Sequence, residues 1–181
     1  VTDTVSLTLT SNFGSSIVNV GRFTYLRDNE PGLANSENPE ATVRNTGTGT
    51  ALIVGRNFFS PRFTNIKRFQ WGDTLSYVRG RHSWKFGADF IHDTIANFFP
   101  GNFSGSFTFQ TLEAFGRNLT GVSQLVAGDV SYLQAFAGTG TTGPTTTPNL
   151  LDIGFFVQDE WRVSPNVTFS GGLRYDVQHI A

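Results

Sequence analysis

The stretch FFVQDEWRVSPNVTFSGGLRYDV, residues 155–177, decides the fold that we expect for this chain of 181 residues. From Val167 to Gln178 apolar or glycine positions alternate with polar positions, and the run that begins at Leu151 repeats this alternation. Successive side chains of a β-strand point to opposite faces, so each run predicts a strand with one apolar and one polar face. The Ser-Pro-Asn corner at residues 164–166 is typical of a tight turn. The stretch therefore predicts an antiparallel hairpin.

A second hairpin of the same kind is expected where RFQWGDTLSYVRG, residues 68–80, meets RHSWKFGADFIHD, residues 81–93. In the second of these runs one face is shared by His82, Trp84, Phe86, Ala88, Phe90 and His92. Weaker alternation predicts further strands at residues 3–10, at residues 17–27 with a register slip at Gly21, at residues 103–110 and at residues 122–136. Together these segments predict an all-β fold of about eight antiparallel strands.

The links between the expected strands differ in length in a regular way. Short corners near residues 11–16, 79–81 and 164–166 alternate with long Gly-, Thr-, Asn- and Pro-rich links near residues 28–64 and 137–149. Outer-membrane barrels are built in this way, with short turns on the periplasmic side and longer loops outside. We therefore expect the Gly-Thr run at residues 45–50 to be part of an outer loop.

The two expected faces differ in chemistry. Aromatic residues make up 14% of the chain. We expect Trp71, Trp84 and Trp161, each placed near a short corner, to form an interfacial aromatic girdle. The opposite face carries charges of both signs, which we expect to line a watery lumen: Lys85, Asp89, Asp93, Glu160, Arg162, Arg174 and Asp176. The fold class predicted from these features is all-β, an antiparallel transmembrane β-barrel segment in contact with outer-membrane lipid.

Several function classes are disfavoured by the residues themselves. The formal net charge of −1 gives no basic excess for nucleic-acid binding, and the absence of cysteine removes thiol chemistry and disulfides. His82 and His92 lie about 33 Å apart along a strand, so they cannot share a metal ion. Asp159 and Glu160 point to opposite faces of their strand, which argues against joint acid-base work. We expect no enzymatic activity, no catalytic residue, no metal and no cofactor.

Two acidic residues conflict with the predicted faces. Asp73 and Asp159 fall on the apolar register, where a charge is costly at the bilayer midplane and less so near an interface. A bulge at Gly72 would reconcile this position, and so would strand ends that already lie outside the hydrocarbon. The sequence leaves both explanations open.

The two hairpins resemble those of a known family. The first resembles a hairpin of TonB-dependent outer-membrane receptors, and the matching residues are Phe156, Gln158, Asp159, Trp161, Gly172, Leu173, Arg174, Tyr175 and Asp176. The second resembles the companion hairpin of the Oar-like branch, whose members carry an N-terminal carboxypeptidase-regulatory-like domain. Its matching residues are Gly80, His82, Lys85, Phe86 and Gly87.

The resemblance implies a barrel of 22 strands in the outer membrane of a Gram-negative-type bacterium, with a plug in its lumen. Such receptors import metal chelates, vitamins or glycans with energy relayed by the inner-membrane TonB complex. Residues 1–181 then form a partial barrel, and we find in them no plug-like segment, TonB box or signal peptide. The plug and the TonB complex are expected as partners in the full-length protein only, and the nutrient is unknown.

Two alternatives remain open from the sequence. A complete small barrel of eight strands with a structural or adhesion role predicts that the first and last strands pair. A soluble β-sandwich that binds a ligand such as carbohydrate also alternates, and it predicts that the Phe-rich face is buried.

Overall fold

The computed structural model describes residues 1–45, 49–120 and 127–180, which contain eleven β-strands, one α-helix and one 3-10 helix. The chain divides into two compact units. The sheet unit consists of residues 1–29, 65–96 and 147–181, and the link unit consists of residues 30–64 and 97–146. The all-β fold expected from the sequence is confirmed, and each unit is described below by itself.

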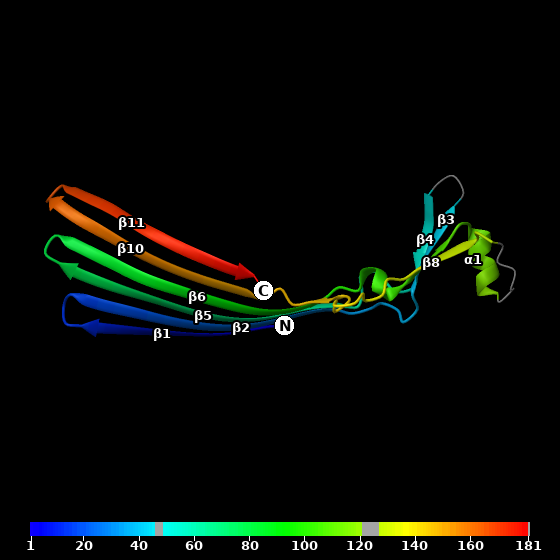
Figure 1. The fold of residues 1–181 in the computed structure, drawn as a ribbon, viewed down its shortest axis with the longest axis horizontal. Coiled ribbons are helices and arrows are strands. Elements are labelled where there is room, and N and C mark those ends of the chain that lie inside the picture. The colour runs from blue at the N-terminus through cyan, green and yellow to red at the C-terminus, as the bar shows by residue number, and fades with distance from the viewer. Residues whose placement is uncertain (46–48, 121–126, 181) are drawn as a thin grey trace. The chain divides into compact units, whose positions relative to one another are not determined.

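Six long strands make up most of the sheet unit, and residues 30–32, 62–64 and 97–98 at their ends are counted in the link unit. They are β1 (Thr2–Phe13), β2 (Ile17–Gly32), β5 (Arg62–Arg79), β6 (His82–Phe98), β10 (Leu150–Ser164) and β11 (Val167–Ile180). The strand order is β1-β2-β5-β6-β10-β11, and the pairs β1–β2, β6–β10 and β10–β11 are antiparallel. The three turns within β1–β2, β5–β6 and β10–β11 lie at the same end of the sheet (Figure 1). This arrangement confirms the two predicted hairpins, and β1 and β2 form a third across the short corner expected near residues 11–16.

The sheet is open at both edges. Among the described residues, β1 pairs with β2 alone and β11 pairs with β10 alone. A complete small barrel requires that its first and last strands pair. In the described residues β1 and β11 do not pair. The strands contain 12 to 18 residues, which exceeds the roughly 9–11 residues that a tilted transmembrane strand needs.

The register of the β1–β2 hairpin is regular throughout. Pairing runs unbroken from Thr2 opposite Asp28 to Phe13 opposite Ile17, with Leu9 opposite Gly21. The expected slip at Gly21 is thus wrong, because this glycine continues the ladder as an ordinary strand residue. An irregularity occurs instead in β10 between Arg162 and Ser164, directly before the turn.

One face of the sheet is lined with aromatic rings that touch across neighbouring strands. Phe23 of β2 lies 5.4 Å from Trp71 of β5, and Trp71 lies 5.3 Å from Phe90 of β6, measured between ring centroids. Trp161 of β10 contacts Phe169 of β11 in the same way. We call this surface the aromatic face; by strand alternation it also carries Leu7, Phe69, Trp84, Phe86, Phe155, Val157, Leu173 and Tyr175.

The aromatic face is exposed in the structure. The exposed fraction is 79% for Leu173, 61% for Phe169 and 56% for Phe155. A soluble sandwich would bury this face against a second sheet, so the expectation attached to that alternative is wrong for the described residues.

The opposite surface, which we call the polar face, carries hydroxyl and charged groups that contact one another across neighbouring strands. The Ser6 hydroxyl lies 3.2 Å from the Thr24 hydroxyl, and the Arg68 guanidinium pairs with Asp93. Further residues of the polar face are Thr4, Thr8, Arg22, Gln70, Lys85, Asp89, Gln158, Glu160, Arg174 and Asp176. The face alternation predicted for the two hairpins therefore extends over all six long strands.

The link unit contains structure that the sequence did not predict. Strands β3 (Glu40–Asn45), β4 (Gly49–Val54), β7 (Ser106–Phe109) and β8 (Val130–Leu133) form a second sheet in the order β4-β3-β7-β8, and β3 pairs with β7 in parallel. Helix α1 (Leu112–Leu119), a 3-10 helix η1 (Gly101–Ser104) and a short β9 (Thr145–Thr146) complete the unit. The core consists of Ala41, Val43, Phe109 and Ala114.

Three expectations for this region need correction. The link near residues 28–64 is not a plain loop, because β3 and β4 pair as a hairpin within it. The strand expected at residues 103–110 shortens to β7, since Phe103 belongs to the 3-10 helix. Of the strand expected at residues 122–136 the structure shows β8 alone, and residues 122–126 lie outside the described residues.

No helix among the described residues is long and apolar enough to cross a membrane.

Candidate functional site

A charge cluster on the polar face is centred on Arg174 of β11. Its Nη1 atom lies 3.3 Å from Oδ2 of Asp89 on β6, and its Nη2 atom lies 2.7 Å from Oδ1 of Asp176. Strand β10 runs between β6 and β11, and it presents Gly154 at this point. A Cβ atom at Gly154 would lie 2.6 Å from Nη2 of Arg174. The missing side chain therefore lets the guanidinium reach across an entire strand.

A second ion pair on the polar face joins Arg68 of β5 to Asp93 of β6. Both contacts, Nε to Oδ1 and Nη2 to Oδ2, are 2.7 Å long, so the pair is bidentate. Asp93 is 2% exposed, whereas the Arg68 side chain remains 41% exposed. Burying a carboxylate this well is costly unless an opposite charge compensates it, and Arg68 supplies that charge.

The seven charged residues expected to line a lumen all lie on the polar face, but they do not form one group. The structure brings Asp89, Arg174 and Asp176 together and pairs Asp93 with Arg68. Lys85, Glu160 and Arg162 lie closer to the turns and have no ion pair among the described residues. Arg68 itself was missed, although its register with Gln70 and Thr74 could have placed it on this face.

The three tryptophans all lie on the aromatic face, at different distances from the turns along their strands. Trp84 and Trp161 both stack on the His82 ring with centroid distances of 5.7 Å, close to the turns that precede β6 and follow β10. We expected Trp71 near a short corner as well, and this position is wrong. Trp71 lies in the middle of β5, because that strand continues to Arg79 before it turns.

Asp73 and Asp159, the two acidic residues that conflict with the predicted apolar register, each have a polar partner on the neighbouring strand. Asp159 of β10 lies 2.7 Å from Nδ1 of His82 on β6, and Asp73 of β5 accepts a hydrogen bond of 2.7 Å from the Asn19 amide of β2. The second oxygen of Asp159 is buried without a partner among the described residues. These cross-strand contacts explain how both carboxylates are tolerated on an otherwise apolar surface.

Replacing Asp159 by alanine should destabilise the folded protein by about 1–3 kcal/mol, because His82 then loses its partner between two tryptophans. Asp159→Asn should cost less, since the amide still offers a hydrogen bond to the imidazole. The measurement is urea-induced unfolding of the full-length protein in lipid vesicles. A double-mutant cycle with His82→Ala isolates the pair, and strictly additive effects would contradict the assignment.

Residues of the two sequence motifs also meet on the polar face. Phe156 of β10 is opposite Gly87 of β6, and its ring covers the position that a Cβ of Gly87 would occupy. The same register places Asp159 opposite Trp84, beside His82. The two motifs are separated in sequence but lie on adjacent strands, and their residues pack against one another.

Replacing Gly87 by alanine should reduce assembly of the full-length barrel, because the new methyl group overlaps the Phe156 ring. Overpacking of this kind costs about 1–3 kcal/mol. The measurement is the heat-modifiable fraction on gels after urea titration. Gly171→Ala is the matched control, since a Cβ there meets no atom within 4 Å. Equal behaviour of the two variants, or no rescue of Gly87→Ala by Phe156→Ala, would contradict the packing argument.

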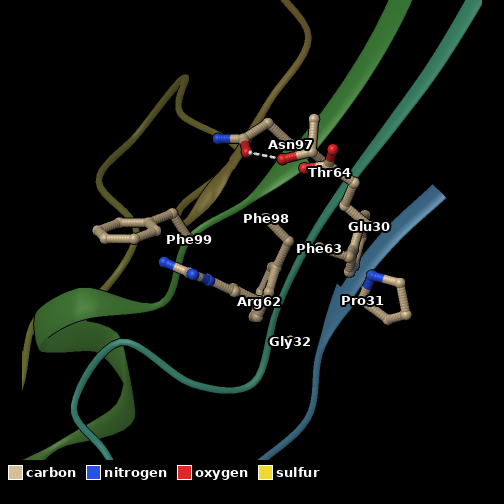
Figure 2. Close-up of a pocket in the computed structure, with 9 residues that line it drawn as sticks. All are labelled: Glu30, Pro31, Gly32, Arg62, Phe63, Thr64, Asn97, Phe98 and Phe99. Carbon is tan, nitrogen blue, oxygen red and sulfur yellow. Dashed lines mark hydrogen bonds between the residues drawn. The ribbon is translucent and has the colours of Figure 1, made fainter. Parts of the chain in front are cut away.

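A cleft of about 430 Å³ lies in the link unit. Figure 2 shows it between Glu30–Gly32, Arg62–Thr64 and Asn97–Phe99, with the Arg62 side chain extending toward Phe99. Thr64 donates a hydrogen bond of 2.9 Å to the Asn97 amide oxygen, and the Phe63 and Phe98 rings stack at 5.5 Å. The sequence motifs contain none of these residues. The Glu30 carboxylate and the Arg62 guanidinium both line this cleft, so it can contact a polar ligand.

The described residues contain no group of three or more His, Cys, Asp or Glu side chains placed to hold a metal ion. Comparison with curated proteins and comparison with solved structures gave no match. A protein family described as outer membrane beta barrel domain matches residues 2–181, nearly the whole chain. The match agrees with the long antiparallel strands and the two chemically distinct faces. The chain therefore belongs to the outer membrane beta-barrel domain family, and its location is the outer membrane.

Proposed function

We propose that the chain is a wall segment of a TonB-dependent outer-membrane transporter of the Oar-like branch, which imports a large or scarce nutrient. In this proposal the 22-stranded barrel is completed by other parts of the full-length protein. The plug and the TonB complex are partners of that full-length protein. The segment itself is not enzymatic; it contributes one lumen-facing and one lipid-facing surface to the barrel wall.

The observation that carries the proposal is the contact between the two motifs that resemble this family. Asp159 and Phe156 belong to the first motif, and His82 and Gly87 belong to the second. Asp159 bonds to His82, and Phe156 packs on Gly87, across the β6–β10 pair. Residues that match the family pattern at two distant places in the sequence are thus in contact on adjacent strands. These contacts support the assignment of both motifs to the same family.

The polar face is assigned to the lumen and the aromatic face to lipid. Solvation of a wide lumen favours charged groups such as the Arg174 cluster, whereas lipid favours the exposed rings of Phe155 and Phe169. Trp84 and Trp161 then lie where strands leave the hydrocarbon, and the three short turns face the periplasm. Lys85, Glu160 and Arg162, which lack an ion pair among the described residues, are available to contact the plug or the nutrient.

The transport proposal is tested in three strains of the source bacterium: the parent, a strain without the encoding gene, and a strain without TonB. Growth is measured with metal chelates, vitamins or glycans as the limiting nutrient. We expect both deletions to lose growth on the same nutrient class. The full-length gene should restore growth in the first deletion strain and should fail to do so when TonB is also absent.

Rescue that is independent of TonB would contradict the proposal, and so would growth equal to that of the parent on every nutrient class. The neighbouring coding sequence gives an additional check. A plug domain and a TonB box upstream, with further hairpins downstream, are expected for the transporter.

A further inference from the structure

A cavity of about 660 Å³ in the link unit lies between the β4-β3-β7-β8 sheet and helix α1. Its sheet side is formed by side chains that extend the small apolar core, and its helix side is formed by the last turns of α1. The described lining residues are all uncharged: Ser36, Asn38, Pro39, Ala41, Val54, Gly55, Phe107, Phe109, Phe115, Asn118, Leu119 and Val130. The cavity is therefore lined by aromatic rings together with amide and hydroxyl groups.

One wall of the cavity is held open by backbone contacts. The Arg56 amide donates a hydrogen bond of 2.8 Å to the Asn38 carbonyl, and the Asn35 side chain donates one of 3.1 Å to the Gly55 carbonyl. Gly55 has φ of +86°, and a Cβ there would overlap the Pro39 carbonyl. The chain crosses itself so closely at this point that only a glycine fits at residue 55.

The opposite wall is fixed by the ends of helix α1. Thr111 caps the helix, since its hydroxyl accepts a hydrogen bond of 3.0 Å from the Ala114 amide. Arg117 pairs with Glu113 at 2.9 Å and with Asp129, which precedes β8. These contacts fasten both turns of the helix, and they engage its charged residues outside the cavity lining. Hydrogen bonds on one side and the helix cap and ion pairs on the other therefore hold the two walls of the cavity in place.

We propose that this cavity binds a neutral, mainly apolar small molecule that contains a ring system. Its volume lies within the range of about 300–1,000 Å³ that is typical of small-molecule sites. Phe107, Phe109 and Phe115 offer ring contacts, and the Asn38 and Asn118 amides offer hydrogen bonds for one polar group. A charged ligand would lose hydration without gaining an opposite charge from the described lining, so the site selects against ions. The inference goes beyond the proposed transport function and does not depend on TonB.

Binding is tested with the full-length protein in lipid nanodiscs. The probe is N-phenyl-1-naphthylamine, whose fluorescence rises in apolar surroundings, and empty nanodiscs supply the baseline. Its sulfonated relative, 1-anilinonaphthalene-8-sulfonate, has the same ring system with a negative charge. We expect saturable binding above the baseline, with the neutral probe at least tenfold tighter than the charged one. Binding that does not exceed the baseline, or equal affinity for both probes, would overturn the proposal.

A matched pair of variants locates the site. Leu119→Trp places an indole at the cavity, whereas Leu112→Trp makes the same change at the other end of α1, outside the lining. Both leucines are exposed, 69% and 48%, so both variants are expected to fold. Leu119→Trp should weaken probe binding at least tenfold and Leu112→Trp less than twofold. Equal effects of the two changes would place the probe elsewhere and overturn the assignment.

Discussion

Replacing Arg68 by methionine is expected to destabilise the full-length barrel by about 3 kcal/mol. The change removes a bidentate partner at 2.7 Å from Asp93, which is 2% exposed and would remain as an uncompensated buried charge. Breaking such pairs typically costs about 3–5 kcal/mol, and the lower end applies because the Arg68 side chain is 41% exposed. The measurement is urea-induced unfolding of the protein in lipid vesicles.

Two controls make the Arg68 result specific. Arg79→Met removes an exposed arginine of the same strand that has no ion pair among the described residues, and it should change stability by less than about 0.5 kcal/mol. The double variant Arg68→Met with Asp93→Leu removes both charges and should recover most of the loss. A loss in the double variant as large as in Arg68→Met would contradict the ion-pair explanation.

Replacing Leu173 by arginine is expected to destabilise the barrel by about 2–4 kcal/mol, the cost of a cation near the bilayer midplane. Leu173 lies in the middle of β11, opposite Val157, and it is 79% exposed on the aromatic face. The yield of heat-modifiable protein in the outer membrane, together with urea-induced unfolding, measures the effect.

Ser170→Arg is the matched control for the Leu173 variant. Ser170 lies on the polar face of the same strand, opposite Glu160, where a cation meets a negative charge and water. Its effect should be below about 0.5 kcal/mol. A cost as large at Ser170 as at Leu173, or a tolerated Leu173→Arg, would show that the aromatic face does not contact lipid.

The sheet unit could be predicted because its signal is local. Period-two alternation in each run fixes which residues share a face, and the short corners fix which strands are hairpin partners. The β10–β11 hairpin of the structure, Leu150–Ser164 and Val167–Ile180, follows this alternation closely. The prediction therefore needed no knowledge of distant contacts.

The link unit could not be predicted, because it is formed by segments that lie far apart in the sequence. Strand β3 pairs in parallel with β7, so residues 40–43 meet residues 106–109. Val43 is fully buried only when α1 and β7 cover it. The segments contain only four to six residues each, which is too few for alternation to identify them, and their pairing depends on these long-range contacts. The capping residue Thr111 was a local signal for α1 that the alternation argument overlooked.

The partners of the buried and half-buried carboxylates on each face also could not be predicted from the sequence. Alternation placed Asp159 on the aromatic face, where a carboxylate conflicts with the apolar surroundings, but it gave no partner for this residue. His82 supplies that partner from 77 positions away, through the antiparallel register of β6 with β10. Arg68 and Asp93 meet in the same way across the β5–β6 pair. Such contacts depend on a register that hydrophobic alternation alone does not determine.

We infer that one face of this sheet contacts lipid and that the other contacts water. The sequence contains no cysteine, so single cysteines can be placed along β11 of the full-length protein, with any other cysteine removed, and spin-labelled in lipid vesicles. Collisions with oxygen and with a water-soluble nickel chelate are then measured at each position. We predict that positions 169, 171, 173 and 175 favour oxygen and positions 168, 170, 172, 174 and 176 favour the chelate. A profile without this alternation, or with the opposite phase, would contradict the account.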